Sequence, residues 1–76
     1  MSTHPIKADI SRQIKQLRAR TGYTQAGLAE AIHTGQSNVA KWEDPRKDLP
    51  TVQTLLNIAE VFGVELEIKF VEKTNG

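Results

Sequence analysis

The sequence contains no cysteine, and this absence excludes a disulfide scaffold, a thiolate metal site and a cysteine nucleophile together. Long apolar runs are missing too, and the first residues lack the basic-then-apolar pattern of a signal peptide. We therefore expect a cytoplasmic chain with no membrane partner. The 76 residues allow one domain, and 38% hydrophobic side chains suffice for a small core.

Patterns for catalysis and metal binding are also lacking. No serine stands with a histidine and an aspartate as a nucleophilic triad would require, no paired carboxylates flank a cleft signature, and no glycine-rich phosphate loop occurs. The two histidines, His4 and His33, have no partner at metal-ligand spacing. We expect no enzyme activity, no metal and no cofactor.

A strong charge of one sign is the last absence. The net charge is +1 at pH 7, which taken alone argues against a nucleic-acid partner, because such domains are usually basic. The charge is unevenly spread, however. Basic side chains outnumber acidic ones by three in residues 1–50, whereas acidic ones outnumber basic ones by two in residues 51–76. The near-neutral total therefore conceals a basic part and an acidic part.

The spacing of apolar residues predicts a first helix near the start of the chain. Its stripe consists of Ile6, Ile10, Ile14 and Leu17. Either Pro5 or Asp9 can begin this helix. Gly22 can end it, because glycine readily takes the left-handed conformation that closes a helix.

Two short helices joined by a tight turn are expected next. Thr24 is a suitable N-cap for the second helix, whose buried face begins at Leu28. Residues 33–35, which include a glycine, interrupt the pattern before a third helix that carries Val39 and Trp42 three residues apart. Trp42 could stack on a base, but its helical spacing favours a place in the core. This arrangement is a helix-turn-helix.

The remaining chain predicts a loop, a fourth helix and a strand. The loop holds Arg46 and Lys47, and Thr51 can cap a helix that Gly63 ends. The pattern then changes to a two-residue period, typical of a strand with one buried face. The residues of that face are Val64, Leu66, Ile68 and Phe70.

A lone strand would leave its backbone hydrogen-bonding groups unpaired, so we expect the same strand of a second copy to pair with it. Antiparallel pairing centred on Ile68 places Glu67 opposite Lys69, whereas centring on Glu67 would bring two glutamates together. The sequence thus predicts a homodimer. Residues 1–63 would form the helical domain, and residues 64–76 the dimerisation strand and tail.

Residues 10–63 resemble the lambda-repressor-like helix-turn-helix domain, the Xre/Cro type of bacterial and phage regulators. The resemblance rests on three stretches in order: IKQLRARTGYTQAGLAEAI, SNVAKWED and LPTVQTLLNIAEVFGV. It implies a mainly α fold of four to five helices that binds double-stranded DNA. The C-terminal strand is similar to that of HipB-like antitoxins, in which such tails pair across a dimer.

The resemblance also implies roles for single residues. The positions from which family members reach base edges in the major groove match Gln36, Ser37, Asn38 and Lys41. Those that contact the DNA backbone match Thr24, Gln25, Arg46 and Lys47. The family's buried ion pair between the first and third helices matches Arg18 and Glu43. The chemistry agrees, since glutamine can bind adenine through two hydrogen bonds and lysine favours guanine.

The expected function is that of a transcriptional regulator, a repressor that reads a pseudo-palindromic operator. Two alternatives stay open. The chain could be the antitoxin of a toxin–antitoxin pair, with a cognate toxin as a further partner, and the terminal strand favours this reading. It could also be a protein-interaction module that kept the fold without binding DNA, for which the mild net charge speaks.

Overall fold

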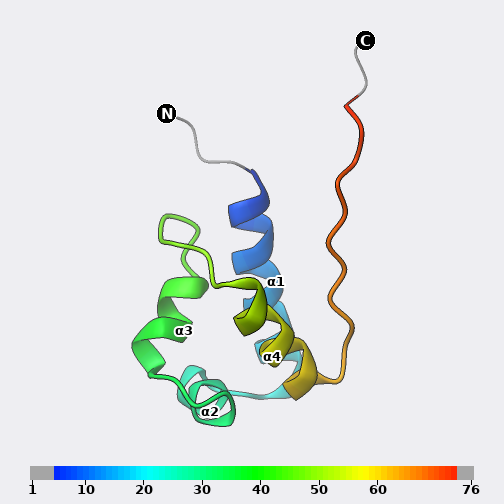
Figure 1. Ribbon diagram of the computed structural model, residues 1–76. Coiled ribbons are helices and arrows are strands. Elements are labelled where there is room, and N and C mark those ends of the chain that lie inside the picture. The colour runs from blue at the N-terminus through cyan, green and yellow to red at the C-terminus, as the bar shows by residue number, and fades with distance from the viewer. Residues whose placement is uncertain (1–4, 74–76) are drawn as a thin grey trace.

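Residues 5–73 are described by the computed structural model, in which four helices are followed by an extended tail (Figure 1). The helices are α1 (Pro5–Thr21), α2 (Gln25–Ala31), α3 (Gln36–Trp42) and α4 (Val52–Phe62). The expected division of the chain falls at Gly63, directly after α4. His4 and the two ends, residues 1–4 and 74–76, lie outside the described residues.

The helix ends are set by the residues that the sequence indicated. The Thr24 hydroxyl accepts a hydrogen bond from the Gly27 N–H at 2.9 Å, and the Thr51 hydroxyl accepts one from the Thr54 N–H at 3.1 Å. Each bond satisfies a backbone donor in the first turn that has no partner within its helix. Gly22, with φ of 82°, follows α1, and Gly63, with φ of 66°, follows α4. The expected helix boundaries are confirmed.

The core lies where α1, α2, α3 and α4 meet. Its buried side chains are Ile14, Leu28, Ala29, Val39 and Ile58. Leu28 and Val39 have no exposed surface, so each contributes about 1.5–3 kcal/mol relative to an exposed position. Trp42 packs against this cluster, which confirms its expected place in the core. The rings of Tyr23 and Phe62 pack edge to face, with their centroids 5.4 Å apart. This contact joins the α1–α2 loop to the end of α4.

The C-terminal strand is absent from residues 5–73, and so is a fifth helix. Residues 64–73 are drawn as an extended segment that runs away from the end of α4 (Figure 1). A strand needs hydrogen bonds to a neighbouring strand, and a single chain of this sequence offers none. Of the expected buried face, only Leu66 is half-buried, while Ile68 is 60% exposed and Phe70 is fully exposed.

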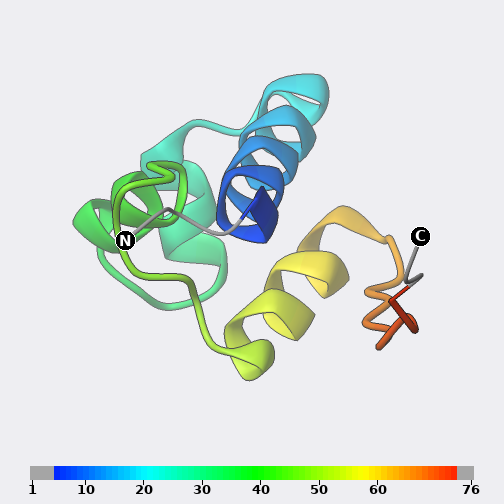
Figure 2. The ribbon, with the colours of Figure 1, turned by 90° about the horizontal axis from the view of Figure 1, so that it is seen from above.

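Two views place α3 and the tail on opposite sides of the molecule. In Figure 1, α3 lies to the left and residues 64–73 to the right, with α4 between them. Figure 2, seen from above, shows the same order. No helix within residues 5–73 is both long enough and apolar enough to cross a membrane.

Candidate nucleic-acid interface

Two backbone hydrogen bonds close the turn between α2 and α3. The Thr34 N–H donates to the Ala29 carbonyl at 2.8 Å, and the His33 N–H donates to the Glu30 carbonyl at 3.2 Å. His33 has φ of 59°, the left-handed region that side chains other than glycine rarely adopt, at a cost of about 1 kcal/mol. The sequence suggested a turn because of Gly35, but the left-handed residue is His33.

The outward face of α3 carries three of the four residues expected to contact bases. Gln36, Ser37 and Lys41 are exposed, whereas Val39 on the opposite face is fully buried. Val39 and Trp42 fix the rotation of α3 about its axis, because their side chains pack into the core. The polar side chains are therefore presented along one exposed stripe.

Asn38 differs from the other three because it is half-buried and already hydrogen-bonded. Its Nδ2 donates to the Thr34 hydroxyl at 2.8 Å. Thr34 thus braces the start of α3, a role that the sequence pattern alone did not indicate. A threonine four residues before an asparagine, at a helix start, is the signal that could have indicated it.

An ion pair joins the end of α1 to the end of α3. The Arg18 Nε donates to the Glu43 Oε2 at 2.6 Å, and the Arg18 Nη2 donates to the Glu43 Oε1 at 3.1 Å. The Glu43 side chain is only 4% exposed. Such a two-pronged contact fixes geometry as well as charge. Arg18 and Glu43 therefore hold α3 against α1.

Two further groups converge on this ion pair from the start of α2. The Arg18 Nη1 donates to the Tyr23 carbonyl at 3.0 Å, and the Gln25 Nε2 donates to the Glu43 Oε1 at 3.2 Å. Gln25 is half-buried, so its expected contact with the DNA backbone must begin from this position. The network joins α1, α2 and α3 through one carboxylate.

The ionisation of Glu43 follows from its surroundings. Burial acts to raise the pKa of its carboxyl, but the hydrogen bonds from Arg18 and Gln25, with the charges of Arg18 and Lys15, outweigh it. The pKa of Glu43 consequently lies below its ordinary value. The hydrogen bond to Glu43 raises the pKa of Arg18 in turn. Both groups are charged at neutral pH.

The loop after α3 places its two cations differently. The Arg46 Nε and Nη2 each donate to the Asp44 carboxylate at 3.1 Å. The side-chain hydrogen bonding from Arg46, together with the hydrogen bond from the Arg46 backbone N–H, lowers the pKa of Asp44 to about 2. Arg46 is therefore partly neutralised within its own loop. Lys47 is exposed and forms no ion pair with any other described residue.

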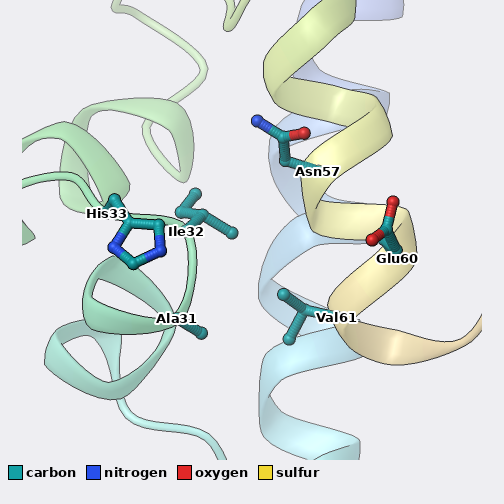
Figure 3. Close-up of a pocket in the computed structure, with 6 residues that line it drawn as sticks. All are labelled: Ala31, Ile32, His33, Asn57, Glu60 and Val61. Carbon is teal, nitrogen blue, oxygen red and sulfur yellow. The ribbon is translucent and has the colours of Figure 1, made fainter.

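A separate groove of about 340 Å³ lies between the end of α2 and α4. In Figure 3, Ile32 and His33 lie on one side of it, with Asn57 and Val61 of α4 on the other. Its titratable side chains are His33 and Glu60. Within residues 5–73, no group of three or more histidine or acidic side chains could hold a metal ion.

Comparison with known proteins identifies the family. A family model described as a helix-turn-helix domain matches residues 9–67. The chain belongs to this family. The lambda-repressor-like identity expected from the sequence is thus confirmed, together with its four-helix fold.

Relatives and solved structures extend this result. The chain is 29% identical over 58 residues to the HTH-type transcriptional regulator ImmR of Bacillus subtilis, covering 76% of this chain and 45% of that protein. It is 37% identical over 59 residues to the HTH-type transcriptional regulator RamB of Mycobacterium tuberculosis, covering 78% of this chain and 12% of that protein. The chain therefore spans less than half the length of these curated relatives.

Among solved structures, the biofilm regulator SinR in complex with DNA superposes with a TM-score of 0.68 at 30% identity, over 74% of this chain and 89% of that one. A chain of the HipA–HipB–O2–O3 complex superposes with a TM-score of 0.69 at 21% identity, over 87% of this chain and 92% of that one. At that identity the second likeness shows the fold alone.

Proposed function

We propose that the chain is a sequence-specific DNA-binding transcriptional regulator that represses from a pseudo-palindromic operator. The observation that carries this proposal is the exposed polar stripe of α3, held in place by the part-buried Arg18–Glu43 pair. The related regulators ImmR and RamB support it, as does the DNA complex of SinR. The proposal includes neither catalysis nor a cofactor, and it places the chain in the cytoplasm, where bacterial DNA lies.

In this proposal α3 enters the major groove of double-stranded DNA. Gln36 suits adenine and Lys41 suits guanine, while Ser37 can contact either bases or phosphates. Asn38 retains its amide oxygen and one N–H for DNA, because its other N–H is bound to Thr34. The DNA backbone would be contacted by Thr24, Gln25, Arg46 and Lys47.

The proposal also assigns the tail to a homodimer. Residues 64–70 would pair with the same segment of a second copy, as the alternating pattern predicts. The exposure of Ile68 and Phe70 supports this assignment, because both side chains would be covered by the pairing. The position of the tail opposite α3 leaves α3 accessible to DNA (Figure 2). Each subunit would read one half-site, roughly 34 Å from the other.

The test is selection of bound sequences from a random DNA pool, followed by affinity measurements on the selected and on a random duplex. Lys41→Ala should lose affinity mainly for the selected duplex, by about tenfold, because a base contact is removed. Lys47→Ala, the matched control, should weaken both duplexes alike and reduce the salt slope by about one. The assignment would be contradicted if the selection recovered no common sequence. It would also be contradicted if Lys41→Ala, like Lys47→Ala, lost the same affinity on the selected and on the random duplex.

The antitoxin reading is a second candidate, and the exposed apolar tail favours it. A toxin bound at Phe70 and Val71 would cover side chains that the single chain leaves open to solvent. Co-production with the protein encoded beside this chain distinguishes the two functions. A stable complex lost on Phe70→Ser would support an antitoxin, and its absence would favour a regulator alone. A protein-interaction module, by contrast, would show no salt-dependent DNA binding.

A further inference from the structure

The contacts around Glu43 reach beyond the ion pair itself. The carboxylate is nearly inaccessible to solvent, yet it accepts hydrogen bonds from two different elements, from Arg18 on α1 and from Gln25 at the start of α2. The ion pair joins α1 to the end of α3. The bond to Gln25 adds a constraint on a side chain that the proposed function places beside the DNA backbone.

The chemistry of the carboxylate determines how that side chain is held. An ionised carboxylate only accepts hydrogen bonds, so the Gln25 amide must turn its nitrogen, and not its oxygen, toward Glu43. The amide nitrogen carries two hydrogens, and the bond to Glu43 uses one of them. The second N–H remains available to another acceptor. Without Glu43, the amide could rotate and present its oxygen, which a phosphate would repel.

The backbone beside Gln25 is fixed by the same pair. Arg18 donates to the Tyr23 carbonyl, two residues before Gln25, and the Thr24 hydroxyl caps α2 between them. The main chain and the amide of Gln25 are therefore both set before any DNA arrives. Such preorganisation improves binding because less side-chain freedom is lost on association.

We propose that Glu43 is a positioning residue for the DNA backbone contact, holding the Gln25 amide nitrogen so that its second N–H meets a phosphate oxygen. This inference rests on the proposed function, and it goes beyond the role of Glu43 as half of an ion pair. Glu43 itself touches no DNA in this arrangement. It acts through Gln25.

The first test is a double-mutant cycle on DNA affinity, with a mixed-sequence duplex of about three helical turns as the probe. Gln25→Ala should weaken binding by about tenfold, near the lower end of the scale for a hydrogen bond to a charged group. Glu43→Gln should weaken it by about fivefold, because the Gln25 amide is retained and only its placement is lost. The double variant should be no weaker than Gln25→Ala alone. Losses that multiply would overturn the proposal, because they would mean that Glu43 acts independently of Gln25.

The matched control cycle pairs Glu43→Gln with Lys47→Ala. Lys47 lies in the loop after α3, and it is not among the described residues that form a hydrogen bond or an ion pair with the Glu43 carboxylate. The two losses should multiply here. Non-multiplicative losses in both cycles would show a general structural effect of Glu43→Gln and would also overturn the positioning role.

A measurement on the unmodified protein covers the case in which Glu43→Gln fails to fold. Nitrogen relaxation of the side-chain amides should give Gln25 an order parameter near that of the rigid backbone, about 0.8, whereas exposed Gln13 and Gln16 on α1 should stay below about 0.6. On addition of the duplex, the chemical shift of one Gln25 side-chain amide proton should change, while that of the amide proton bound to Glu43 should stay the same. A Gln25 amide as mobile as those two controls would overturn the proposal.

DNA binding by the unmodified protein separates failure of the proposed function from failure of the positioning role. If the unmodified protein shows no salt-dependent binding to the duplex, the proposed function fails and this inference fails with it. If binding is normal but Gln25 is mobile or the losses multiply, only the positioning role fails.

Discussion

The helical part of the chain, residues 5–63, and the tail, residues 64–73, differ in how much apolar surface they bury and how many of their hydrogen-bonding groups they satisfy within one chain. Among the described residues, the helical part buries a core drawn from all four helices, although Ile6, Val52 and Leu56 stay about half exposed. It also caps α2 and α4 and leaves no buried side-chain polar atom of residues 5–63 without a hydrogen bond. The tail leaves its apolar side chains largely exposed and forms no ladder. The helical part therefore has a core of its own within one chain, whereas the tail has the features of an interface.

The near-neutral charge also divides unevenly along the chain. Basic side chains outnumber acidic ones by three in residues 1–50, which hold α3, whereas acidic ones outnumber basic ones by two in residues 51–76, which hold α4 and the tail. A dimer would therefore carry little total charge. Its non-specific DNA affinity should be modest, so base contacts and attachment at two half-sites would have to supply specific binding.

The largest expected effect tests whether the helical core is complete. Leu28→Ala removes a side chain with no exposed surface and should lower the free energy of unfolding by about 3 kcal/mol. Leu56→Ala is the matched control, because Leu56 on α4 is 46% exposed and should cost below about 1 kcal/mol. Urea unfolding at one protein concentration measures both. Equal losses would mean that the core does not depend on Leu28.

The next effect concerns the ion pair between α1 and α3. Arg18→Met leaves Glu43 buried without its counter-charge and should cost about 2 kcal/mol, below the range for a fully buried pair because the Arg18 side chain is 18% exposed. Arg12→Met is the control. Its pair with Asp9 is exposed on both sides and should contribute below about 0.5 kcal/mol. A larger loss for Arg12→Met in urea unfolding would reverse the assignment.

The helical part could be predicted because its signals are local. Thr24, Thr51 and the glycines mark helix ends within a few residues, and apolar spacing marks the buried faces. The left-handed His33 was not predicted, because the sequence pointed to Gly35, whereas the turn closes through the backbone bonds of His33 and Thr34 to Glu30 and Ala29.

For the candidate site, the sequence predicts which side chains α3 exposes but not the contacts that they make. The exposed stripe of α3 follows from helical periodicity, and the pairing of Arg18 with Glu43 came from the family resemblance. The bonds of Gln25 to Glu43, of Asn38 to Thr34 and of Arg46 to Asp44 depend on side-chain geometry that periodicity does not encode. For the tail, alternation predicts an extended segment, but pairing depends on a second chain.

A smaller effect should appear in the pH dependence of stability. The pKa of Glu43 is lower in the folded chain than its ordinary value of 4.5, so the stabilisation it provides is complete above 4.5 and is lost as the pH falls through the folded value. Urea unfolding between pH 7 and pH 3 should show this loss. In Arg18→Met, burial becomes the main influence and raises the pKa of Glu43, so this contribution should change sign.

Since Asp44 also has a lowered pKa, the series is made in an Asp44→Asn background. An unchanged pH profile in Arg18→Met would contradict the role of the ion pair.

The smallest expected effect on the stability of a single chain belongs to the tail. Ile68 lies at the centre of the proposed pairing, where it faces its own copy, whereas Val71 lies on the opposite face and is 81% exposed. Ile68→Ser should leave the stability of the dilute monomer unchanged within about 0.5 kcal/mol.

At tens of micromolar, sedimentation equilibrium should show a dimer for the unmodified protein and for Val71→Ser, but a monomer for Ile68→Ser. On a duplex with two half-sites Ile68→Ser should lose affinity, and on a single half-site it should lose none, because only the link between subunits is removed. An unmodified protein that stays monomeric at this concentration would leave the exposed tail without a second copy to cover it, and the comparison would then favour a different protein partner.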